Sequence, residues 1–396
     1  MPNLAIKEKC TGCTACASTC PNHCIEMKKD QNGFRFPEIL NPVSCNSCGA
    51  CQRVCPVISQ KVYSDLPIAY AAYSKDESLR MESSSGGIFS EIAKLVIEKK
   101  GVVYGAAYND AFEVYHCCVE TVDDLAKLRG AKYSESYLGN TFSEILKRIK
   151  QGQYVLFAGM PCQVAGLKSF IKKDFENLIC IDFVCHGVPS PMVWEEYINY
   201  RAKIDADGKL PISINLRSKA TGWSRYQYSN VFQYGKDRNY SCGSSQDLFM
   251  KLFVYDYILR PSCGNCIFKG YSRVSDITLG DFWGIWDIDP KFDDNKGTSV
   301  VLIQSTKGRL LWNEAKDSIL YKKVTLEQAS QQNKAMLNVA QMKENREKVL
   351  SEIRRGNIAY CEELFVDKDQ SVLRKIKRNV KSFLYNLNIR NSKKES

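Results

Sequence analysis

Two runs of four cysteines near the N-terminus share one spacing. Residues 10–21 read CTGCTACASTCP and residues 45–56 read CNSCGACQRVCP, so the pattern C-x2-C-x2-C-x3-C-P occurs twice. This pattern is typical of bacterial ferredoxins with two 4Fe-4S clusters, in which the fourth cysteine of each run ligates the other cluster. We therefore expect one cluster on Cys10, Cys13, Cys16 and Cys55, and a second on Cys45, Cys48, Cys51 and Cys20.

A pair of zinc sites is the alternative for these eight cysteines. Zinc needs only two Cys-x-x-Cys pairs per site, which would leave Cys16, Cys51 and the prolines that end both runs without a role. Disulfides are disfavoured, because the N-terminal residues MPNLAIKEKC do not resemble a secretory signal and thiols stay reduced in the cytoplasm. A ninth cysteine, Cys24, is expected to pack beside the second cluster rather than to bind it.

Four cysteines further along the chain could form another site. Cys162 and Cys185 each follow a predicted strand, at 154–159 and 178–184, and Cys263 and Cys266 form a Cys-x-x-Cys pair. If the two strands are parallel neighbours, both cysteines emerge at the sheet edge where ligands gather in open α/β folds. Four thiolates suit either zinc or a third 4Fe-4S cluster. We favour the cluster, because electrons from the N-terminal clusters need an acceptor.

The elements that must position these cysteines alternate between strand and helix. We expect strands at 69–73, 101–108, 154–159 and 178–184, and helices at 85–100, 141–152, 162–171 and 191–202. The expected fold is a small bacterial-type ferredoxin domain, then a mixed-sheet α/β domain, then a helical tail, an α+β or α/β class. The expected segments are a ferredoxin domain at 1–60, the two parts of the central domain at 66–153 and 154–324, and a basic helical tail at 325–396 with a long polar helix at 325–355.

Three loops carry residues suited to an anionic or flat ligand. The loop ESSSGGIFSE, with Ser84, Ser85, Gly86 and Gly87, precedes a helix and could present N–H groups to a phosphate, or be an ordinary serine-capped helix start. In LRGAKYSES, Arg129 and Lys132 could pair with an anionic ligand or belong to a solvated basic loop.

The third loop region lies between 280 and 299. Asp281 stands beside Phe282 and Trp283, which could floor a flat ring such as an isoalloxazine or simply form an aromatic core strand. The turn DDNKGTS offers polar groups to a ligand, namely Asn295, Lys296, Gly297, Thr298 and Ser299.

Seven motifs in this order resemble those of the coenzyme F₄₂₀ hydrogenase/dehydrogenase family of beta subunits. They are SSSGGIFSE, RGAKY, GMPCQVAGLKSF, IDFVCHGVPSP, CGNCIFKG, SDITLGDFWGI and DDNKGTSVVLI, and the resemblance covers about residues 1–310. It implies a flavoprotein that binds FAD and a 4Fe-4S cluster in the central domain. It assigns Cys162, Cys185, Cys263 and Cys266 to that cluster and favours the ligand-binding interpretation of Ser84–Gly87 and Lys132. We expect the FAD contacts among Ser84, Ser85, Gly86, Gly87, Lys132, Asp281, Asn295, Lys296, Gly297 and Thr298.

The basic charge is concentrated at the C-terminus. The net charge is +11, and residues 366–396 hold nine Lys or Arg against three Asp or Glu. The stretch 371–387 could form a basic amphipathic helix that lies on an anionic membrane, or one that packs on protein. No apolar run is long enough to span a membrane. The expected location is the cytoplasm, with peripheral membrane contact as an option, and a nucleic-acid partner is disfavoured because aromatic residues do not interleave with the basic ones.

The sequence therefore predicts an iron–sulfur flavoprotein oxidoreductase. Electrons would pass between 4Fe-4S clusters and FAD to reduce or oxidise a deazaflavin or another organic substrate, with a redox protein as donor or acceptor. Some bacterial members of the family resemble accessory reductases for cell-surface polysaccharide assembly, which is one setting for this activity. The alternative is an electron-transfer subunit that supplies a separate enzyme. The residues that would perform the catalytic step are not identified.

Overall fold

The N-terminal module is small and built around its cysteines. The computed structural model describes residues 2–60, 65–224 and 227–365. The module holds two short helices, α1 (Ala15–Thr19) and α2 (Ala50–Arg53), and one antiparallel hairpin, β1 (Ile25–Lys29) with β2 (Arg35–Ile39). Both helices begin after a residue with positive φ, Thr14 at 63° and Gly49 at 67°. So few apolar side chains are buried in the module that bound clusters would have to contribute to its stability.

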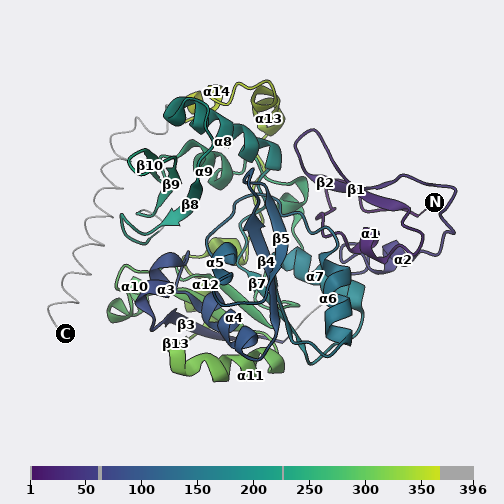
Figure 1. The fold of residues 1–396 in the computed structure, drawn as a ribbon, viewed down its shortest axis with the longest axis horizontal. Helices are drawn as coiled ribbons and strands as arrows, with labels where there is room; N and C mark the ends of the chain where they lie inside the picture. Colours follow the sequence, from purple (N-terminus) through teal and green to yellow (C-terminus); the bar gives the residue numbers. More distant parts are fainter. Residues whose placement is uncertain (1, 61–64, 225–226, 366–396) are drawn as a thin grey trace.

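An eight-stranded mixed sheet forms the centre of the molecule, in the order β13-β3-β12-β11-β7-β6-β4-β5 (Figure 1). Its strands are β3 (Ile68–Ser74), β4 (Val102–Tyr108), β5 (Val114–Val119), β6 (Val155–Gly159), β7 (Leu178–Phe183), β11 (Ile277–Asp281), β12 (Ser299–Ile303) and β13 (Ile319–Val324). Strands β4, β6, β7 and β11 are parallel neighbours, whereas β12, β3, β13 and β5 pair antiparallel. The pairing of β6 with β7 confirms the parallel arrangement expected from the sequence.

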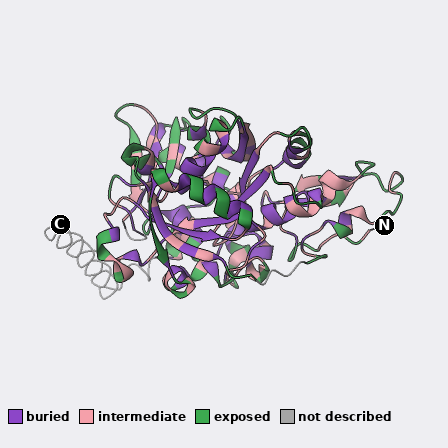
Figure 2. Cartoon of the chain, turned by 90° about the horizontal axis from the view of Figure 1, so that it is seen from below, coloured by how far each residue is buried: buried purple, intermediate pink, exposed green. Residues whose placement is uncertain are grey.

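Helices cover both faces of this sheet, and its central strands are buried along most of their length (Figure 2). One face carries α4 (Ile88–Glu98), α5 (Leu125–Leu128) and α11 (Thr306–Ala315). The other carries α6 (Thr141–Lys150) and α7 (Pro161–Ile171) over β4, β6 and β7, with α10 (Ile285–Ile288) and α12 (Leu326–Ser330) farther along. The short helix α3 (Glu77–Glu82) follows β3. The layers confirm the predicted mixed-sheet α/β fold.

A second lobe lies on the same side of the sheet as the carboxyl ends of its parallel strands (Figure 1). It combines a three-stranded antiparallel sheet with helices, namely β8 (Ser213–Ser218), β9 (Ser229–Gln233), β10 (Asn239–Gly243), α8 (Pro191–Ala206), α9 (Leu248–Val254), α13 (Arg346–Arg354) and α14 (Tyr360–Glu363). Aromatic side chains such as Trp194, Tyr197, Phe232 and Phe249 fill its core. The 3₁₀ turns are η1 (Pro261–Asn265), η2 (Pro290–Phe292), η3 (Lys316–Ser318) and η4 (Lys334–Met336).

The prediction of one long polar helix at 325–355 is wrong. The chain forms α12, the turn η4 and, after an irregular stretch, α13. The cause is tertiary: Met336 and Ala340 are buried, and the Asn333 side chain donates a 2.9 Å hydrogen bond to the Asp281 carbonyl. These contacts outweigh the local helix preference. The predicted basic helix at 371–387 lies outside the described residues. In the part of the chain that is described, no helix has the length and apolar character needed to cross a membrane.

The N-terminal module packs on the central domain through α1, which lies against α7. The closest approach is at Gly166 in α7, where a Cβ atom would stand 2.8 Å from the Cys13 Cβ and 2.9 Å from its Sγ. Because real Cβ atoms do not make such contacts, glycine is required for α1 and α7 to lie this close.

We predict that Gly166→Ala weakens this packing by about 1–3 kcal/mol, because an extra methyl group in a packed contact forces backbone shifts. The melting temperature of the anaerobically purified protein measures the effect. Gly243→Ala is the matched control, since a Cβ there meets open space. Equal melting temperatures for the two variants would contradict the packing described here.

Candidate functional site: three cysteine sets and a cationic cluster

The eight cysteines of the module line two small cavities. One is lined by Cys10, Cys13, Cys16 and Cys55, with Cys51 beside them. The other is lined by Cys20, Cys45, Cys48 and Cys51, with Cys24 beside them. The structure therefore brings together the two crossed sets that the spacing predicts, and Cys24 lies where it was expected. We name these sets the first and the second cysteine set.

The third cysteine set comes together at the carboxyl edge of the sheet. Cys162 lies in the first turn of α7, Cys185 follows β7, and η1 carries Cys263 with Cys266 directly after it. Burial, and then the nearby Cys185, Cys266 and Cys263, raise the pKa of the Cys162 thiol well above its usual value. Burial likewise raises the pKa of Cys185 to about 11 and that of Cys263 to about 12. Such crowded thiols become stable thiolates when a metal binds them.

The distances between ligand cysteines differ between a zinc site and a 4Fe-4S cluster. Within the described ranges, no three His, Cys, Asp or Glu side chains converge closely enough to hold a single ion. A zinc ion would draw its four sulfurs to about 2.3 Å from one point. A 4Fe-4S cubane instead places each cysteine on a different iron, so its ligands stand farther apart.

The two glycine-containing loops predicted to bind an anion lie against each other at this same edge. The Ser85 hydroxyl donates to the Thr298 carbonyl at 3.1 Å, and the Gly86 N–H donates to the Ser299 Oγ at 2.9 Å. Helix α4 begins after Gly87, whose φ is 85°, and no side chain caps it. The alternative of an ordinary serine-capped helix is therefore wrong, because Gly87 is the N-cap and the Ser85 hydroxyl bonds the neighbouring loop instead.

Two buried cations that the sequence analysis missed hold these loops. Arg80 pairs with both oxygens of Asp294 at 2.8 and 2.6 Å and donates to the Gly297 carbonyl at 2.8 Å. The amine of Lys219 donates to the carbonyls of Arg80 at 2.5 Å and Ser85 at 2.6 Å. Burial, reinforced by Arg80 and Arg217, lowers the pKa of Lys219 to about 7. No local pattern marks these residues, since only the folded chain buries them.

Asp281 and the aromatic residues beside it lie next to this cluster. Arg217 binds both oxygens of Asp281 at 2.8 and 3.0 Å and donates to the Tyr133 hydroxyl at 3.3 Å. Trp283 stacks on Trp223 with ring centroids 4.8 Å apart, whereas Phe282 is buried in the core. Phe282 therefore fits the interpretation as a core residue, whereas a role of Trp283 under a flat ring stays a prediction.

The remaining predicted ligand residues differ in their surroundings. The Asn295 side chain accepts from the Trp223 N–H at 2.8 Å, and the Trp223 indole donates to the Ser84 carbonyl at 3.1 Å. Lys296 pairs with Glu77 at 2.6 Å near the surface.

Lys132 is half-buried, and its closest hydrogen bond is to the Arg129 carbonyl at 2.7 Å. Burial lowers the pKa of Lys132 to about 8. Arg129 pairs with Glu82. The ligand role of Lys132 stays a prediction.

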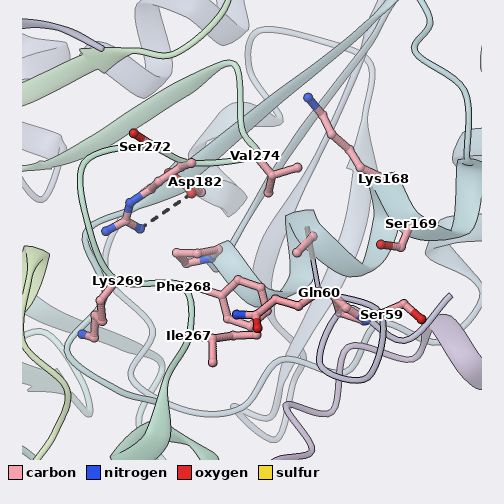
Figure 3. Close-up of a pocket in the computed structure, with 14 residues that line it drawn as sticks. Ser59, Gln60, Lys168, Ser169, Asp182, Ile267, Phe268, Lys269, Ser272 and Val274 are labelled. Carbon is pink, nitrogen blue, oxygen red and sulfur yellow. Dashed lines mark ion pairs between the residues drawn. The ribbon is translucent and has the colours of Figure 1, made fainter. Parts of the chain in front are cut away.

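A pocket of about 200 Å³ opens between the end of the module and the central domain (Figure 3). It is lined by Ser59 and Gln60 from the module and by one side of α7, and Asp182 lies inside it, 3.7 Å from Arg273. Burial raises the pKa of Asp182. None of the ten residues expected to contact FAD lines this pocket, so it is a separate feature.

Comparison with known proteins agrees with the cysteine pattern and the fold. Residues 69–141 and 152–329 match the N- and C-terminal models of the coenzyme F₄₂₀ hydrogenase/dehydrogenase beta subunit, which together cover more than half of the chain. The chain belongs to this family of oxidoreductase subunits. Residues 9–58 match a 4Fe-4S dicluster domain, so the N-terminal module is an iron–sulfur module of the ferredoxin type.

The individual relatives share low sequence identity with this chain or match only a short part of it. One subunit of the F₄₂₀H₂ dehydrogenase of Methanosarcina mazei is 24% identical over 184 residues, which are 43% of this chain and 51% of that protein. A ferredoxin of Saccharopolyspora erythraea is 41% identical over 61 residues, 15% of this chain and 52% of that protein. The chain thus spans about half the length of each of these relatives. One chain of the F₄₂₀-reducing [NiFe] hydrogenase complex from Methanosarcina barkeri aligns over 76% of this chain and 93% of its own, with 16% identity and a TM-score of 0.45.

Replacing Cys263 tests the third cysteine set. We predict that Cys263→Ser lowers the iron content by about four atoms per chain, because the set loses one of four thiolate ligands. The EPR signals of the module should persist. Cys242→Ser is the control, since Cys242 lies in β10 away from all three sets. Unchanged iron in Cys263→Ser would show that this set holds no cluster.

Proposed function

We propose that this protein is an iron–sulfur flavoprotein oxidoreductase that passes electrons between three 4Fe-4S clusters, FAD and an organic substrate. The observation that carries the proposal is the shared location of two sites. The third cysteine set follows β6 and β7, and the cationic cluster lies around the end of β11 and the start of β12. Because β12 runs antiparallel to β11, all these positions fall on one edge of the sheet.

The third set fits a 4Fe-4S cluster by its donors. Cys263 is buried and the other three cysteines are partly buried, and the amide of Val188 lies 3.3 Å from the Cys263 sulfur, to which it would donate. Hydrogen bonds to the sulfurs tune the potential of such clusters. A cubane, unlike zinc, would also give electrons from the iron–sulfur module an acceptor.

The cationic cluster fits the diphosphate of FAD. Arg80, Arg217 and Lys219 are all buried, and the described contacts of the Lys219 amine are to carbonyl oxygens rather than to a carboxylate. The buried Thr298 hydroxyl and the Arg217 Nε have no hydrogen-bond partner among the described residues. Buried polar groups of this kind are normally satisfied, so a ligand with anionic oxygens accounts for them.

A bound flavin would supply the step between single electrons and a hydride, while the protein positions and tunes it. The stacked Trp223 and Trp283 beside Arg217 offer an aromatic surface for a flat ring. Lys132 is the chain neighbour of Tyr133, which accepts from Arg217, and would contribute a further cation.

The name of one relative supports the choice of substrate proposed for this chain. That relative is named as part of an F₄₂₀H₂ dehydrogenase. For this chain we propose a deazaflavin such as coenzyme F₄₂₀, or another organic hydride acceptor, as the substrate. A redox protein would dock at the second cysteine set, because Cys48 of that set is exposed. The same exposure supports the second candidate, an electron-transfer subunit that supplies a separate enzyme.

The direct test is the cofactor content of anaerobically purified protein. We expect about twelve iron atoms per chain, the number that three 4Fe-4S clusters contain, together with one FAD seen in the visible spectrum. Turnover with reduced coenzyme F₄₂₀ and a dye, without any partner protein, separates the first candidate from the second. Protein that carries no flavin and iron for only two clusters would refute the proposal.

Changing Lys219 tests the flavin site. Lys219→Met should weaken FAD binding by roughly tenfold or more, the usual cost of losing a hydrogen bond to a charged group. Because the pKa of Lys219 is about 7 without an anion, binding a phosphate above that pH must take up a proton. The affinity of wild type for FAD should therefore fall as the pH rises above 7, and this slope should be absent from Lys219→Met.

Equilibrium dialysis of flavin-depleted protein at several pH values provides the measurement. Lys99→Met is the matched control, since Lys99 follows α4 at the opposite edge of the sheet and pairs with Glu314. Equal FAD affinity in Lys219→Met and Lys99→Met would place the flavin elsewhere.

A further inference from the structure

Arg260 is buried at the junction between the N-terminal module and the central domain. Its side chain is 1% exposed, and its Nε donates to the Cys10 carbonyl at 2.8 Å. One terminal nitrogen pairs with Glu135, and the other donates to the Arg35 carbonyl at 2.9 Å. Its guanidinium also lies over the Phe36 ring at 4.2 Å. One side chain thus ties three segments together.

The same guanidinium lies close to sulfurs of both domains. Its Nη2 stands 3.8 Å from the Cys10 Sγ. Its charge interacts with Cys10 of the first set and also with Cys263 and Cys162 of the third set. Along the chain, Arg260 directly precedes η1, and its carbonyl accepts from the Cys263 N–H at 2.9 Å. Arg260 therefore stands between the first and the third cysteine sets.

A second contact joins the same two sets. Cys13 of the first set packs on Gly166 in α7. Gly166 lies four residues after Cys162 of the third set, and the thiols of Cys13 and Cys162 interact electrostatically. The second set is placed differently. Its cavity is lined by module residues, and Cys48 beside it is exposed.

We propose that the first cysteine set is the point at which the module exchanges electrons with the central domain, and that Arg260 positions the two neighbouring clusters and sets their potentials. The proposal rests on the three clusters of the proposed function. A permanent positive charge favours the reduced form of a nearby cluster, which carries one more negative charge. Arginine suits this position, because its planar fork can bind the Cys10 carbonyl, the Arg35 carbonyl and Glu135 at once, which a lysine cannot.

The test compares two changes at this position in the full-length protein. Arg260→Gln removes the positive charge, and Arg260→Lys keeps it. The double variant Arg260→Gln with Glu135→Gln removes both partners of the ion pair, so it leaves the net charge unchanged and controls for a Glu135 that is buried without its main partner. Redox titration followed by EPR should show two of the three midpoint potentials moving to more negative values in Arg260→Gln, moving less in the double variant, and staying close to wild type in Arg260→Lys.

The cluster whose potential does not move should be the one lost in Cys48→Ser. The proposal is overturned if no potential changes in Arg260→Gln, or if the potential assigned through Cys48→Ser changes most. Wild-type protein with fewer than three clusters would count against the proposed function instead, so the two failures are distinguishable.

A second measurement requires no change at Arg260. Two reduced clusters that lie close together broaden each other's EPR signals. Cys48→Ser removes the second set's cluster and should leave the broadening of the third set's signal intact. Loss of that broadening in Cys48→Ser would mean that the second set is the neighbour, and would overturn the proposed order.

Discussion

The parallel pairing of β6 with β7 is the contact on which the rest of the site depends. It brings Cys162 and Cys185, which are separated by a helix and a strand in sequence, to one edge of the sheet. The loop with Cys263 and Cys266 comes from the second lobe and completes the set at that edge. Because β11 pairs parallel with β7, Asp281 and the loop before β12 also reach this edge. One register of parallel strands therefore fixes both the candidate cluster site and the candidate flavin site.

This arrangement buries several positively charged side chains. Arg80, Arg217, Lys219 and Arg260 are each less than a tenth exposed, and burying a cation is unfavourable unless it is paired and hydrogen-bonded. Three of them have a carboxylate partner, namely Asp294, Asp281 and Glu135. The described contacts of the Lys219 amine are instead to carbonyls, and burial, reinforced by Arg80 and Arg217, lowers its pKa. An anionic ligand at that point would stabilise the charged form of Lys219.

Much of the site could be predicted from the sequence, for physical reasons that also explain what could not. Metal ligands are restricted to a few residue types at fixed local spacing, so the cysteines of the module indicated their crossed sets directly. Cys162 and Cys185 could be paired because strand–helix alternation implies parallel strands. Arg80, Lys219 and Arg260 could not be found, because a buried cation looks like any surface residue until the chain around it is folded. The stretch 325–355 was misjudged for the same reason, since buried contacts of Met336 and Ala340 override its helical pattern.

The segment Lys132–Ser136 touches both candidate sites. Tyr133 accepts a hydrogen bond from Arg217 beside Asp281, and Glu135 holds Arg260 at the module junction. Two residues of extended chain span at most about 7 Å. Covalent geometry, rather than the docking of two separate surfaces, therefore limits how far Arg217 and Arg260 can move apart. Thermal motion can tilt this short piece of backbone but cannot lengthen it, so the partners of the two arginines keep nearly the same separation.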